Sequence, residues 1–330
     1  MVRIWFNHWF STAYRFIEGL KEKDENYVIV SNERDTSAQQ AVADEFYVEP
    51  VFSNGADYLD WCLTFCKEHN VDVFFPRRGA ALMASNIEKF EELGVKVIVE
   101  RDRNIHKLFD SKYESCLYVG ENNLCAVPKM FLVNTREEFL RACAAIIEQY
   151  GNKHCICIKR DTDEGGITFK RVYGAKDKLY YNEVLIKDAE KIIAESEAPY
   201  VVMPYLEEPE ISIDCLRTPE GFIAVPRIKE TSRVTRICFD AELLEIAHKI
   251  NDNLKIEYPY NIQLRQLNGK YMFMEINLRL SGGSFKDRAV GCNFPQLALD
   301  VATGNRIDYQ GIIEAQKEVR VVSVEDYAII

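Results

Sequence analysis

The first hundred residues alternate short apolar segments with longer amphipathic ones, and no other feature of the sequence constrains the fold as strongly. The spacing predicts strands at residues 2–7, 26–33, 71–76 and 95–100, and helices at residues 11–23, 57–70 and 80–94. Strands that alternate with helices pair in parallel through βαβ connections. The sequence therefore predicts an open parallel α/β domain over residues 1–105.

The turn after the first of these strands, FNHWFSTAYRF, contains no glycine. Dinucleotide-binding domains of this architecture need glycines there, because the backbone must turn tightly and approach a pyrophosphate closely. The sequence therefore argues against a nicotinamide or flavin site in this domain.

The remaining chain changes character after a helical linker at residues 106–123. A smaller lobe, residues 124–203, has predicted strands at 128–134, 154–160, 167–173 and 200–207, and helices at 135–151 and 187–196. Thr135 and Glu138 have the spacing of a helix capping box. A larger lobe, residues 204–330, contains paired strands at 210–218, 221–230, 260–267 and 271–280, helices at 240–254 and 294–304, and a terminal strand within 318–330.

Composition is that of a soluble globular protein, with 47% hydrophobic and 28% charged residues. No apolar run approaches the roughly 20 residues of a membrane span, and the N-terminus MVRIWFNHWF does not resemble a secretory signal. The net charge of -11 argues against nucleic acid as a partner. The ten cysteines form no CxxC pair, so we expect reduced thiols in a cytoplasmic protein, with no membrane partner.

Residues 271–280 combine an apolar and a polar face, because side chains of a strand alternate. One predicted face carries Met272, Met274, Ile276, Leu278 and Leu280, and the other carries Phe273, Glu275, Asn277 and Arg279. A buried charge without a partner is costly, so the polar face must either meet water or bind something. Exposure to solvent is the simpler interpretation.

The preceding strand decides between these interpretations. It contains Gln263 and turns back at Asn268-Gly269. A loop with an odd number of residues puts Gln263 on the same face as Glu275 and Asn277, whereas a two-residue turn puts it on the other face. The odd loop would gather hard oxygen ligands of the kind that Mg²⁺ prefers. Arg279, just beyond, suits a phosphate oxygen.

Two further segments could bind a nucleotide. Lys159 precedes the loop RDTDEGG, and a lysine before Gly165 and Gly166 fits a hairpin that cradles phosphates, although paired glycines also serve in plain turns. The segment VVMPYLEEPEISID bends at Pro204 and reaches Glu210. Its exposed backbone could pair with an adenine edge and its carboxylate with a ribose, or it could be an acidic surface.

The motifs YNIQL and MEINLRLSGG, preceded by CIKRDTDEGG and EPEISID, resemble the ATP-grasp superfamily, most closely its carbamoyl phosphate synthetase-like members, over residues 105–305. The first domain resembles the pre-ATP-grasp domain. The resemblance implies a two-lobed ATP-grasp fold, with residues 124–203 as the small lobe and lid and residues 204–330 as the lobe with the metal site. It also implies ATP and Mg²⁺, or Mn²⁺ in its place, as cofactors.

The nucleotide positions implied by the resemblance are Lys112, Lys159, Gly165, Gly166, Met203, Pro204, Tyr205, Leu206 and Glu210. In such enzymes the lysines hold phosphates, the glycines form a lid, the residues equivalent to 203–206 form the adenine hinge and the glutamate binds ribose. The implied metal ligands are Gln263, Glu275 and Asn277. The implied catalytic residues are Arg279 and Lys159. Arg227 is a third catalytic candidate, because its strand should line the same cleft and could face the acceptor site.

The resemblance further implies that ATP activates an organic carboxylate as an acyl phosphate, which an amine then attacks, releasing ADP and phosphate. Gly282 stands where carbamoyl phosphate synthetases carry arginine, which argues against bicarbonate. Two alternatives remain: a non-catalytic nucleotide-binding module, suggested by acidic residues in the loop after Lys159, and a kinase of a small-molecule hydroxyl. A homodimer is left open. Further candidates for contact with substrate are His8, Arg77, Arg78, Lys286 and Arg288.

Overall fold

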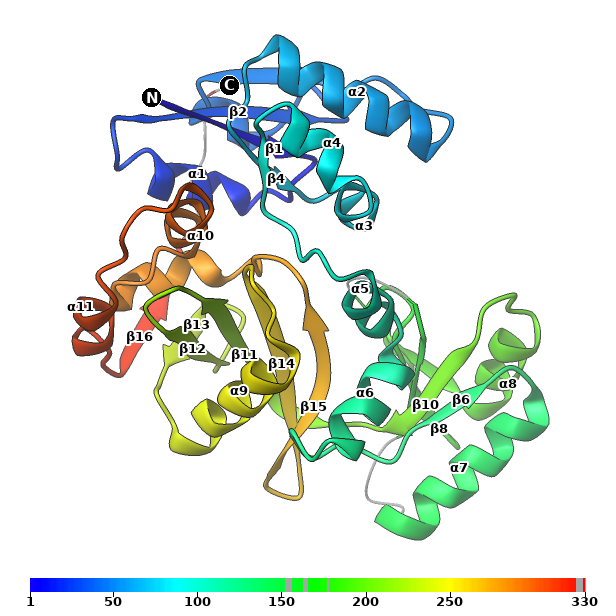
Figure 1. Cartoon of the computed structure of the whole chain (residues 1–330). Helices are drawn as coiled ribbons and strands as arrows, with labels where there is room; N and C mark the ends of the chain where they lie inside the picture. The colour runs from blue at the N-terminus through cyan, green and yellow to red at the C-terminus, as the bar shows by residue number, and fades with distance from the viewer. Residues whose placement is uncertain (152–155, 163–165, 177, 325–328, 330) are drawn as a thin grey trace. The chain divides into compact units, whose positions relative to one another are not determined.

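The computed structural model describes residues 1–151, 156–162, 166–176, 178–324 and 329 (Figure 1). It contains three sheets with helices around them, so the predicted combination of an open parallel sheet with other mixed layers is confirmed. The chain divides into two compact units. The first comprises Met1–His106, Ile211–Ile262 and Asn277–Ile330, and the second comprises Lys107–Glu210 and Gln263–Ile276.

The N-terminal sheet is parallel, as predicted, and has the strand order β3-β2-β1-β4-β5. Its strands are β1 (Val2–Asn7), β2 (Asn26–Asn32), β3 (Glu45–Val48), β4 (Val73–Pro76) and β5 (Lys96–Val97). The helices between them are α1 (Ala13–Leu20), η1 (Ala38–Ala41), α2 (Gly55–Glu68), α3 (Ala80–Ala84) and α4 (Ile87–Glu92), followed by α5 (Arg103–Asp110). The single helix predicted over residues 80–94 is thus two helices, because the chain leaves helical geometry at Asn86, which has φ -131°.

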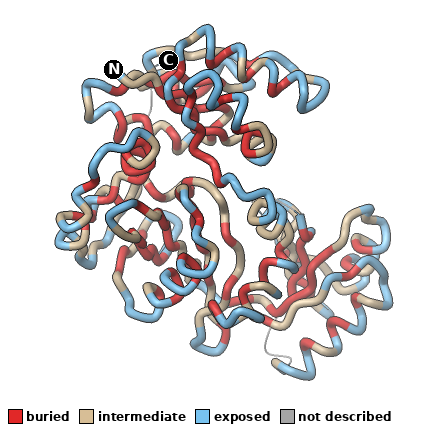
Figure 2. Tube along the Cα trace, viewed as in Figure 1, coloured by how far each residue is buried: buried red, intermediate tan, exposed pale blue. Residues whose placement is uncertain are grey.

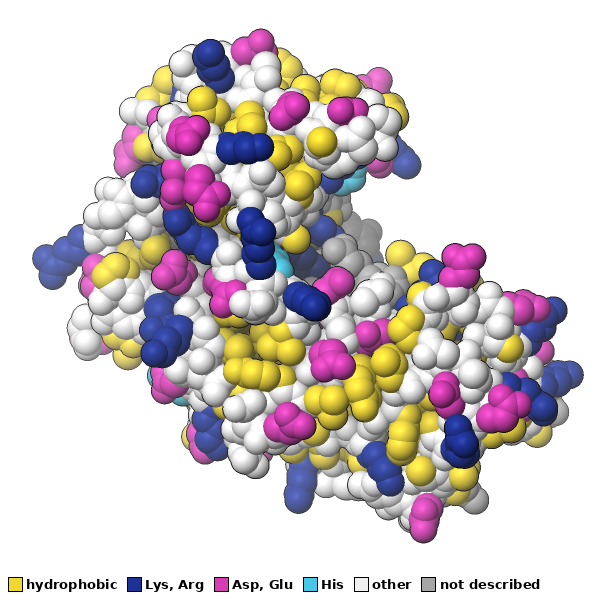
Figure 3. All heavy atoms as spheres, turned by 45° about the vertical axis from the view of Figure 1, so that its right-hand side comes forward, with side chains coloured by type: hydrophobic (Ala, Val, Ile, Leu, Met, Phe, Trp, Pro, Cys, Tyr) yellow, Lys and Arg dark blue, Asp and Glu magenta, His cyan; other side chains and the backbone are white. Residues whose placement is uncertain are grey.

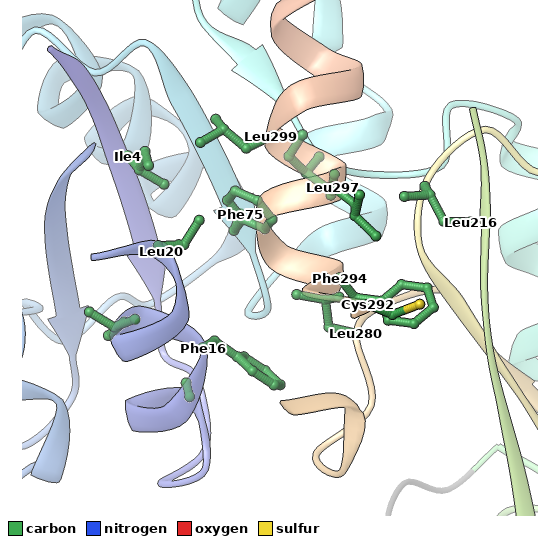
Figure 4. Close-up of a cluster of buried hydrophobic side chains, with 14 of the residues drawn as sticks. Ile4, Phe16, Leu20, Phe75, Leu216, Leu280, Cys292, Phe294, Leu297 and Leu299 are labelled. Atoms are coloured by element: carbon green, nitrogen blue, oxygen red, sulfur yellow. The ribbon is translucent and has the colours of Figure 1, made fainter. Parts of the chain in front are cut away.

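Both faces of this sheet are covered. On one face Trp5 and Phe74 pack with α2, α3 and α4, and on the other Ile4 and Phe6 pack with α1. The second cluster continues to α10 and to Leu216 and Leu280, so the N-terminal sheet and part of the C-terminal region share one apolar core (Figure 4). Figure 2, in the same view as Figure 1, shows that buried residues are concentrated where the sheets lie.

The second unit contains a mixed sheet of order β6-β10-β7-β8-β9, in which only β8 and β9 pair in parallel. Its strands are β6 (Phe131–Val133), β7 (Ile156–Arg160), β8 (Lys170–Tyr173), β9 (Glu183–Leu185) and β10 (Tyr200–Pro204). Its helices are α6 (Lys112–Glu121), α7 (Arg136–Tyr150) and α8 (Ile186–Ala194). The predicted capping box of α7, between Thr135 and Glu138, is confirmed.

The third sheet has the order β15-β14-β11-β12-β13-β16. Its strands are β11 (Glu207–Arg217), β12 (Phe222–Lys229), β13 (Val234–Ile237), β14 (Tyr260–Leu267), β15 (Lys270–Asn277) and β16 (Val319–Val322). The associated helices are α9 (Ala241–Leu254), η2 (Ser284–Val290), α10 (Phe294–Thr303) and α11 (Tyr309–Glu314). Strands β11, β14 and β15 each contain a point at which the chain passes from one compact unit to the other.

Acidic and basic side chains are interspersed on the face of the molecule displayed in Figure 3. Within the described ranges, no helix has the length and apolar character needed to cross a bilayer. The nine cysteines that the structure describes are free thiols, and all but Cys125 are buried.

Candidate functional site

The hairpin of β14 and β15 carries the predicted metal ligands, and its turn decides which side chains can share a face. It turns through two residues, Asn268 and Gly269, whose φ values of 53° and 75° both lie in the left-handed region favoured by Asn-Gly. Of the two turns that the sequence leaves open, the structure therefore has the two-residue turn. Counted from a two-residue turn, regular pairing sets Gln263 opposite Met274, on the other face of the hairpin from Glu275.

Strand β15 is also shorter than predicted, because it ends at Asn277 and does not continue to Leu280. Glu275 and Asn277 are alternate residues of the strand, as expected for two ligands on one face. Phe273, which was predicted on the polar face, is fully buried, and its N–H donates to the carbonyl of Ala126 at 2.8 Å. The face is therefore polar only toward the end of the strand.

Arg279 lies immediately beyond this strand. Its Nη2 donates to Oδ1 of Asn277 at 3.3 Å, and its Nη1 donates to the carbonyl of Leu280 at 3.2 Å. Its guanidinium carbon is 5.7 Å from the centre of the Phe10 ring, a separation at which a cation is attracted to an aromatic face. The guanidinium is thus held beside the amide that was predicted to bind the metal.

The two predicted phosphate-binding lysines are buried in the second unit. Lys159 lies on β7, and Lys112 is the first residue of α6, where its Nζ donates to the carbonyl of Asp161 at 3.0 Å. Burial raises the pKa of the Cys116 thiol to about 12 against the opposing charge of Lys159, and Glu275 is among the charges that raise it further. Lys159 and Glu275 therefore both lie within electrostatic reach of one buried thiol.

Asp161 is one of the acidic residues in the loop after Lys159, and it turns inward. Its side chain is buried: Oδ2 accepts from Ser111 Oγ at 2.7 Å, and Oδ1 accepts from the backbone N–H of Tyr113 at 2.8 Å. The carboxylate thus satisfies a free N–H at the start of α6, where the helix dipole favours negative charge. This structural role accounts for an acidic residue close to Lys159 in the sequence.

The two glycines predicted to cover the phosphates follow this segment. Gly165 lies outside the described residues, together with Asp163 and Glu164. Gly166 is exposed, with φ 67°, a left-handed conformation that glycine adopts without strain. The N–H of Phe169 donates to the Gly166 carbonyl at 3.1 Å, so the chain turns tightly here. The role of these glycines as a lid stays a prediction.

The predicted adenine hinge spans the end of β10 and the step into β11, and it comprises Met203, Pro204, Tyr205 and Leu206. Met203 and Leu206 are buried in an apolar cluster with Cys157, Val201 and Leu267. Tyr205 is half-buried, and the guanidinium carbon of Arg171 lies 4.4 Å from its ring centre. The hinge is therefore fixed by packing on one side.

Arg265 joins the hinge to the predicted ribose ligand, and the sequence analysis missed it. Its Nη1 donates to the carbonyl of Leu206 at 3.4 Å and to the Tyr205 hydroxyl at 3.3 Å, while its Nη2 lies 3.5 Å from Oε2 of Glu210. The sequence did contain a signal for Arg265: it lies two residues after Gln263 and therefore on the same face of β14.

Arg227 was predicted to line the acceptor site, but its side chain is only 7% exposed and is enclosed by carboxylates. Its Nε donates to Oδ2 of Asp214 at 2.8 Å, its Nη2 contacts the same oxygen, and Asp287 Oδ1 lies 3.1 Å from Nε. Nη2 also donates to Ser281 Oγ at 2.7 Å, and a Cβ atom at Gly283 would overlap the guanidinium. The described contacts make Arg227 a residue that positions the segment after β15.

Lys286 and Arg288, the other candidates near that segment, have partners of their own. Lys286 Nζ donates to Thr235 Oγ1 at 2.7 Å, and burial lowers the pKa of Lys286, with the charges of Arg227 and Lys229 adding to the effect. Arg288 pairs with Glu22. Neither contact indicates a role in catalysis.

The donor set on β15 suits a metal ion that arrives with a nucleotide. The part of the chain that the structure describes contains no group of three or more His, Cys, Asp or Glu side chains able to hold a metal ion. Mg²⁺ commonly binds through one or two carboxylates and takes its other ligands from water and substrate phosphates. Glu275 and Asn277 satisfy this requirement, whereas Gln263 as a third ligand rests on motif resemblance alone.

Comparison with known proteins identifies the fold. Residues 196–327 match the family model described as "ATP-grasp in the biosynthetic pathway with Ter operon". N5-carboxyaminoimidazole synthetase from Staphylococcus aureus has a similar structure, with a TM-score of 0.68 and 14% identity over 93% of this chain and 78% of that chain. The chain has an ATP-grasp fold.

The ATP-grasp fold confirms the resemblance predicted from the motifs. It is shared with the biotin carboxylase domain of 2-oxoglutarate carboxylase from Hydrogenobacter thermophilus, whose structure contains MgADP, ADP and bicarbonate (TM-score 0.67, 16% identity, 93% of this chain and 70% of that chain). Biotin carboxylase from Campylobacter jejuni, in a βγ-ATP complex, is also similar (TM-score 0.67, 17% identity, 93% and 72%). No curated protein sequence matches the chain.

Proposed function

We propose that this ATP-grasp protein is a ligase that uses ATP to activate an organic carboxylate as an acyl phosphate, which an amine then attacks with release of ADP and phosphate. The observation that carries the proposal is that Lys159 and Glu275, from two separate motifs of the second unit, both act electrostatically on the buried thiol of Cys116. A buried cation and a carboxylate so placed can serve the phosphates and the metal of one nucleotide.

Each motif residue then has a defined task. The Lys159 ammonium, on a buried strand, stabilises the charge of the phosphates more strongly than it could in water. Met203 to Leu206 present backbone groups to adenine, and Arg265 fixes the position of Glu210 for the ribose. Glu275 and Asn277 would hold Mg²⁺ or Mn²⁺, which neutralises charge on the phosphoryl group being transferred.

Arg279 is the residue best placed to bind the transferred phosphoryl group or the acyl phosphate. Its contact with Asn277 holds the guanidinium beside the metal position, and a planar guanidinium binds two phosphate oxygens at once. Closure of the glycine-containing loop after Lys159 would then keep water from the labile acyl phosphate.

An organic acid fits the site better than bicarbonate. The position of a Cβ atom at Gly282 lies 3.4 Å from the ring of Phe10 and 3.4 Å from Thr12 Oγ1. Both separations are ordinary van der Waals contacts, so Gly282 packs beside Phe10 and Thr12 and supplies no guanidinium to a bicarbonate ion. The small residue instead favours a substrate that is held by other groups.

The proposed function is tested by measuring ADP release from purified protein with MgATP and mixtures of carboxylic acids and amines. We expect ADP release that depends on both an acid and an amine, and a product whose mass equals their sum less water. Release of ADP that no acid accelerates would refute the ligase. A stable phosphorylated product formed without an amine would indicate a hydroxyl kinase instead.

Replacement of Lys159 with methionine is expected to raise the KM for ATP by about 10- to 100-fold, because a charged hydrogen bond to phosphate is worth roughly 1.5–3 kcal/mol. Methionine is similar in length and suits a buried strand position, so the fold should persist. Lys187, an exposed lysine on α8, provides the matched control as Lys187→Met. Equal KM values for the two variants would remove Lys159 from the nucleotide site.

A further inference from the structure

The carboxyl edge of the N-terminal sheet carries a network of polar side chains that is not part of the proposed nucleotide site. The strand order β3-β2-β1-β4-β5 changes direction between β1 and β4. Helix α1, which follows β1, packs on one face of the sheet, whereas α3, which follows β4, packs on the other. In open α/β sheets, ligands bind at the carboxyl edge where the strand order reverses in this way.

Arg78 follows β4 at this point, and its guanidinium is held on two sides. Nη1 donates to Oε2 of Glu49 at 3.3 Å, and the guanidinium carbon lies 4.6 Å from the ring centre of Tyr58. The Glu49 side chain is fully buried, and its Oε1 accepts from Ser31 Oγ at 2.8 Å. Ser31 Oγ in turn accepts from Trp5 Nε1 at 3.0 Å. A chain of buried groups thus fixes one half-buried cation.

Asn7, the fully buried last residue of β1, fixes the backbone of the same segment. Its Oδ1 accepts from the N–H of Arg77 at 2.6 Å, and its Nδ2 donates to the carbonyl of Arg78 at 3.1 Å. The Arg78 side chain nevertheless remains 35% exposed. A guanidinium that is already held in place loses little conformational entropy when it binds a ligand.

The two loops that flank the reversal are basic. Residues 8–12 and 77–79 contain His8, Arg77 and Arg78 and no acidic residue. Among the described residues, His8 Nε2 lies 3.9 Å from Glu33, in the loop after β2, and Arg78 pairs with Glu49. Planar guanidinium groups recognise carboxylate and phosphate oxygens in particular.

We propose that this edge binds an anionic group, a carboxylate or a phosphate, of an organic substrate, with Arg78 as its principal ligand. That the anion belongs to a substrate rests on the proposed ligase function. Anion binding itself can be measured without nucleotide or turnover, so the two can fail separately.

The test measures the shift in melting temperature caused by methyl phosphate and, separately, by acetate, in the absence of nucleotide. Four proteins are compared: wild type, Arg78→Gln, Arg3→Gln and Lys159→Met. Arg3 also pairs with a glutamate, Glu45 at 2.8 Å, but at the opposite end of β1, so it controls for the loss of an Arg–Glu pair. Lys159→Met controls for phosphate bound at the nucleotide site.

We expect wild type, Arg3→Gln and Lys159→Met to bind one of the two probes equally well, and Arg78→Gln to bind it about tenfold more weakly or worse. The preferred probe identifies the substrate's anionic group as phosphate or carboxylate. If Arg78→Gln does not fold, Arg78→Lys should show intermediate affinity. The proposal is overturned if wild type binds neither probe, if the Arg78 variants bind as wild type does, or if Lys159→Met abolishes binding.

Discussion

Replacement of Glu275 with glutamine is expected to reduce kcat for ATP-dependent ligation by at least about 100-fold. Loss of a group that stabilises charge in the transition state commonly reduces kcat by this factor. Glu275 is the only carboxylate among the three predicted metal ligands. Glutamine keeps its shape and hydrogen bonding but removes the charge that a divalent cation requires. The measurement is kcat and KM for ATP over a range of Mg²⁺ concentrations.

A matched control is Glu207→Gln, which removes an exposed carboxylate of the same unit on β11. Its kinetics should equal those of the wild type. The Glu275 variant should also bind MgATP more weakly in a calorimetric titration, while metal-free ATP binds nearly as well as before. MgATP binding and turnover that both survive Glu275→Gln would contradict the metal site and leave a nucleotide-binding protein whose metal is held elsewhere.

Gln263 should be the least sensitive of the three predicted ligands. The two-residue turn at Asn268-Gly269 assigns Gln263 to the opposite face of the hairpin from Glu275 under regular pairing. Gln263→Ala is therefore expected to change kcat much less than Glu275→Gln. Equal losses in the two variants would show that the strands depart from regular pairing between the turn and these residues.

The sequence was sufficient for features that depend on local pattern. The N-terminal strands Val2–Asn7 and Asn26–Asn32 are long apolar runs, and their alternation with helices requires a parallel sheet. The α7 cap depends only on the spacing of Thr135 and Glu138. By contrast, Glu45–Val48 was missed, because an edge strand that is only half-buried has little apolar signature.

The sequence motifs were sufficient to predict which segments form the candidate site. The roles of individual side chains were not predictable, because they depend on contacts between segments that are distant in the sequence. Asp161 could not be recognised as a helix cap from sequence, because the N–H that it accepts from belongs to Tyr113. Arg265 was missed for the same reason, since Leu206 and Glu210 lie more than fifty residues earlier in the chain. The sequence also could not decide between an odd-numbered loop and a two-residue turn, because Asn-Gly occurs in both.

The largest expected effect on stability is at the buried Arg227 network. Arg227→Met should lower the free energy of unfolding by about 3–5 kcal/mol, because the Asp214 carboxylate then remains buried without its cation. The control is Arg320→Met, which removes the exposed pair of Arg320 with Glu230, 2.7 Å apart, and should cost about 1 kcal/mol or less. Urea unfolding monitored by circular dichroism measures both. A loss at Arg227 no larger than at Arg320 would contradict the buried network.

One guanidinium cannot neutralise two carboxylates, and this makes the network sensitive to pH. Arg227 makes two contacts to Asp214, so Asp287, which is completely buried, is the acid left less well compensated. Burial raises the pKa of Asp287 well above its ordinary value of 3.8, and the charge of Arg227 only partly opposes the shift. The folded protein therefore retains a proton on Asp287 that the unfolded chain releases above pH 3.8.

The sign of the resulting pH dependence follows from proton binding. Between pH 3.8 and the raised pKa, the folded state binds more protons than the unfolded state, so the contribution of Asp287 to stability falls as pH rises. Asp287→Asn imitates the protonated acid and does not titrate. We expect this variant to be at least as stable as the wild type at pH 7, with an advantage that shrinks as the pH is lowered toward 4, whereas Asp214→Asn should be destabilised at both pH values. An Asp287→Asn variant that is less stable at pH 7 than at pH 4, relative to the wild type, would mean that Asp287 is ionised in the folded protein and that Arg227 is shared equally between the two acids.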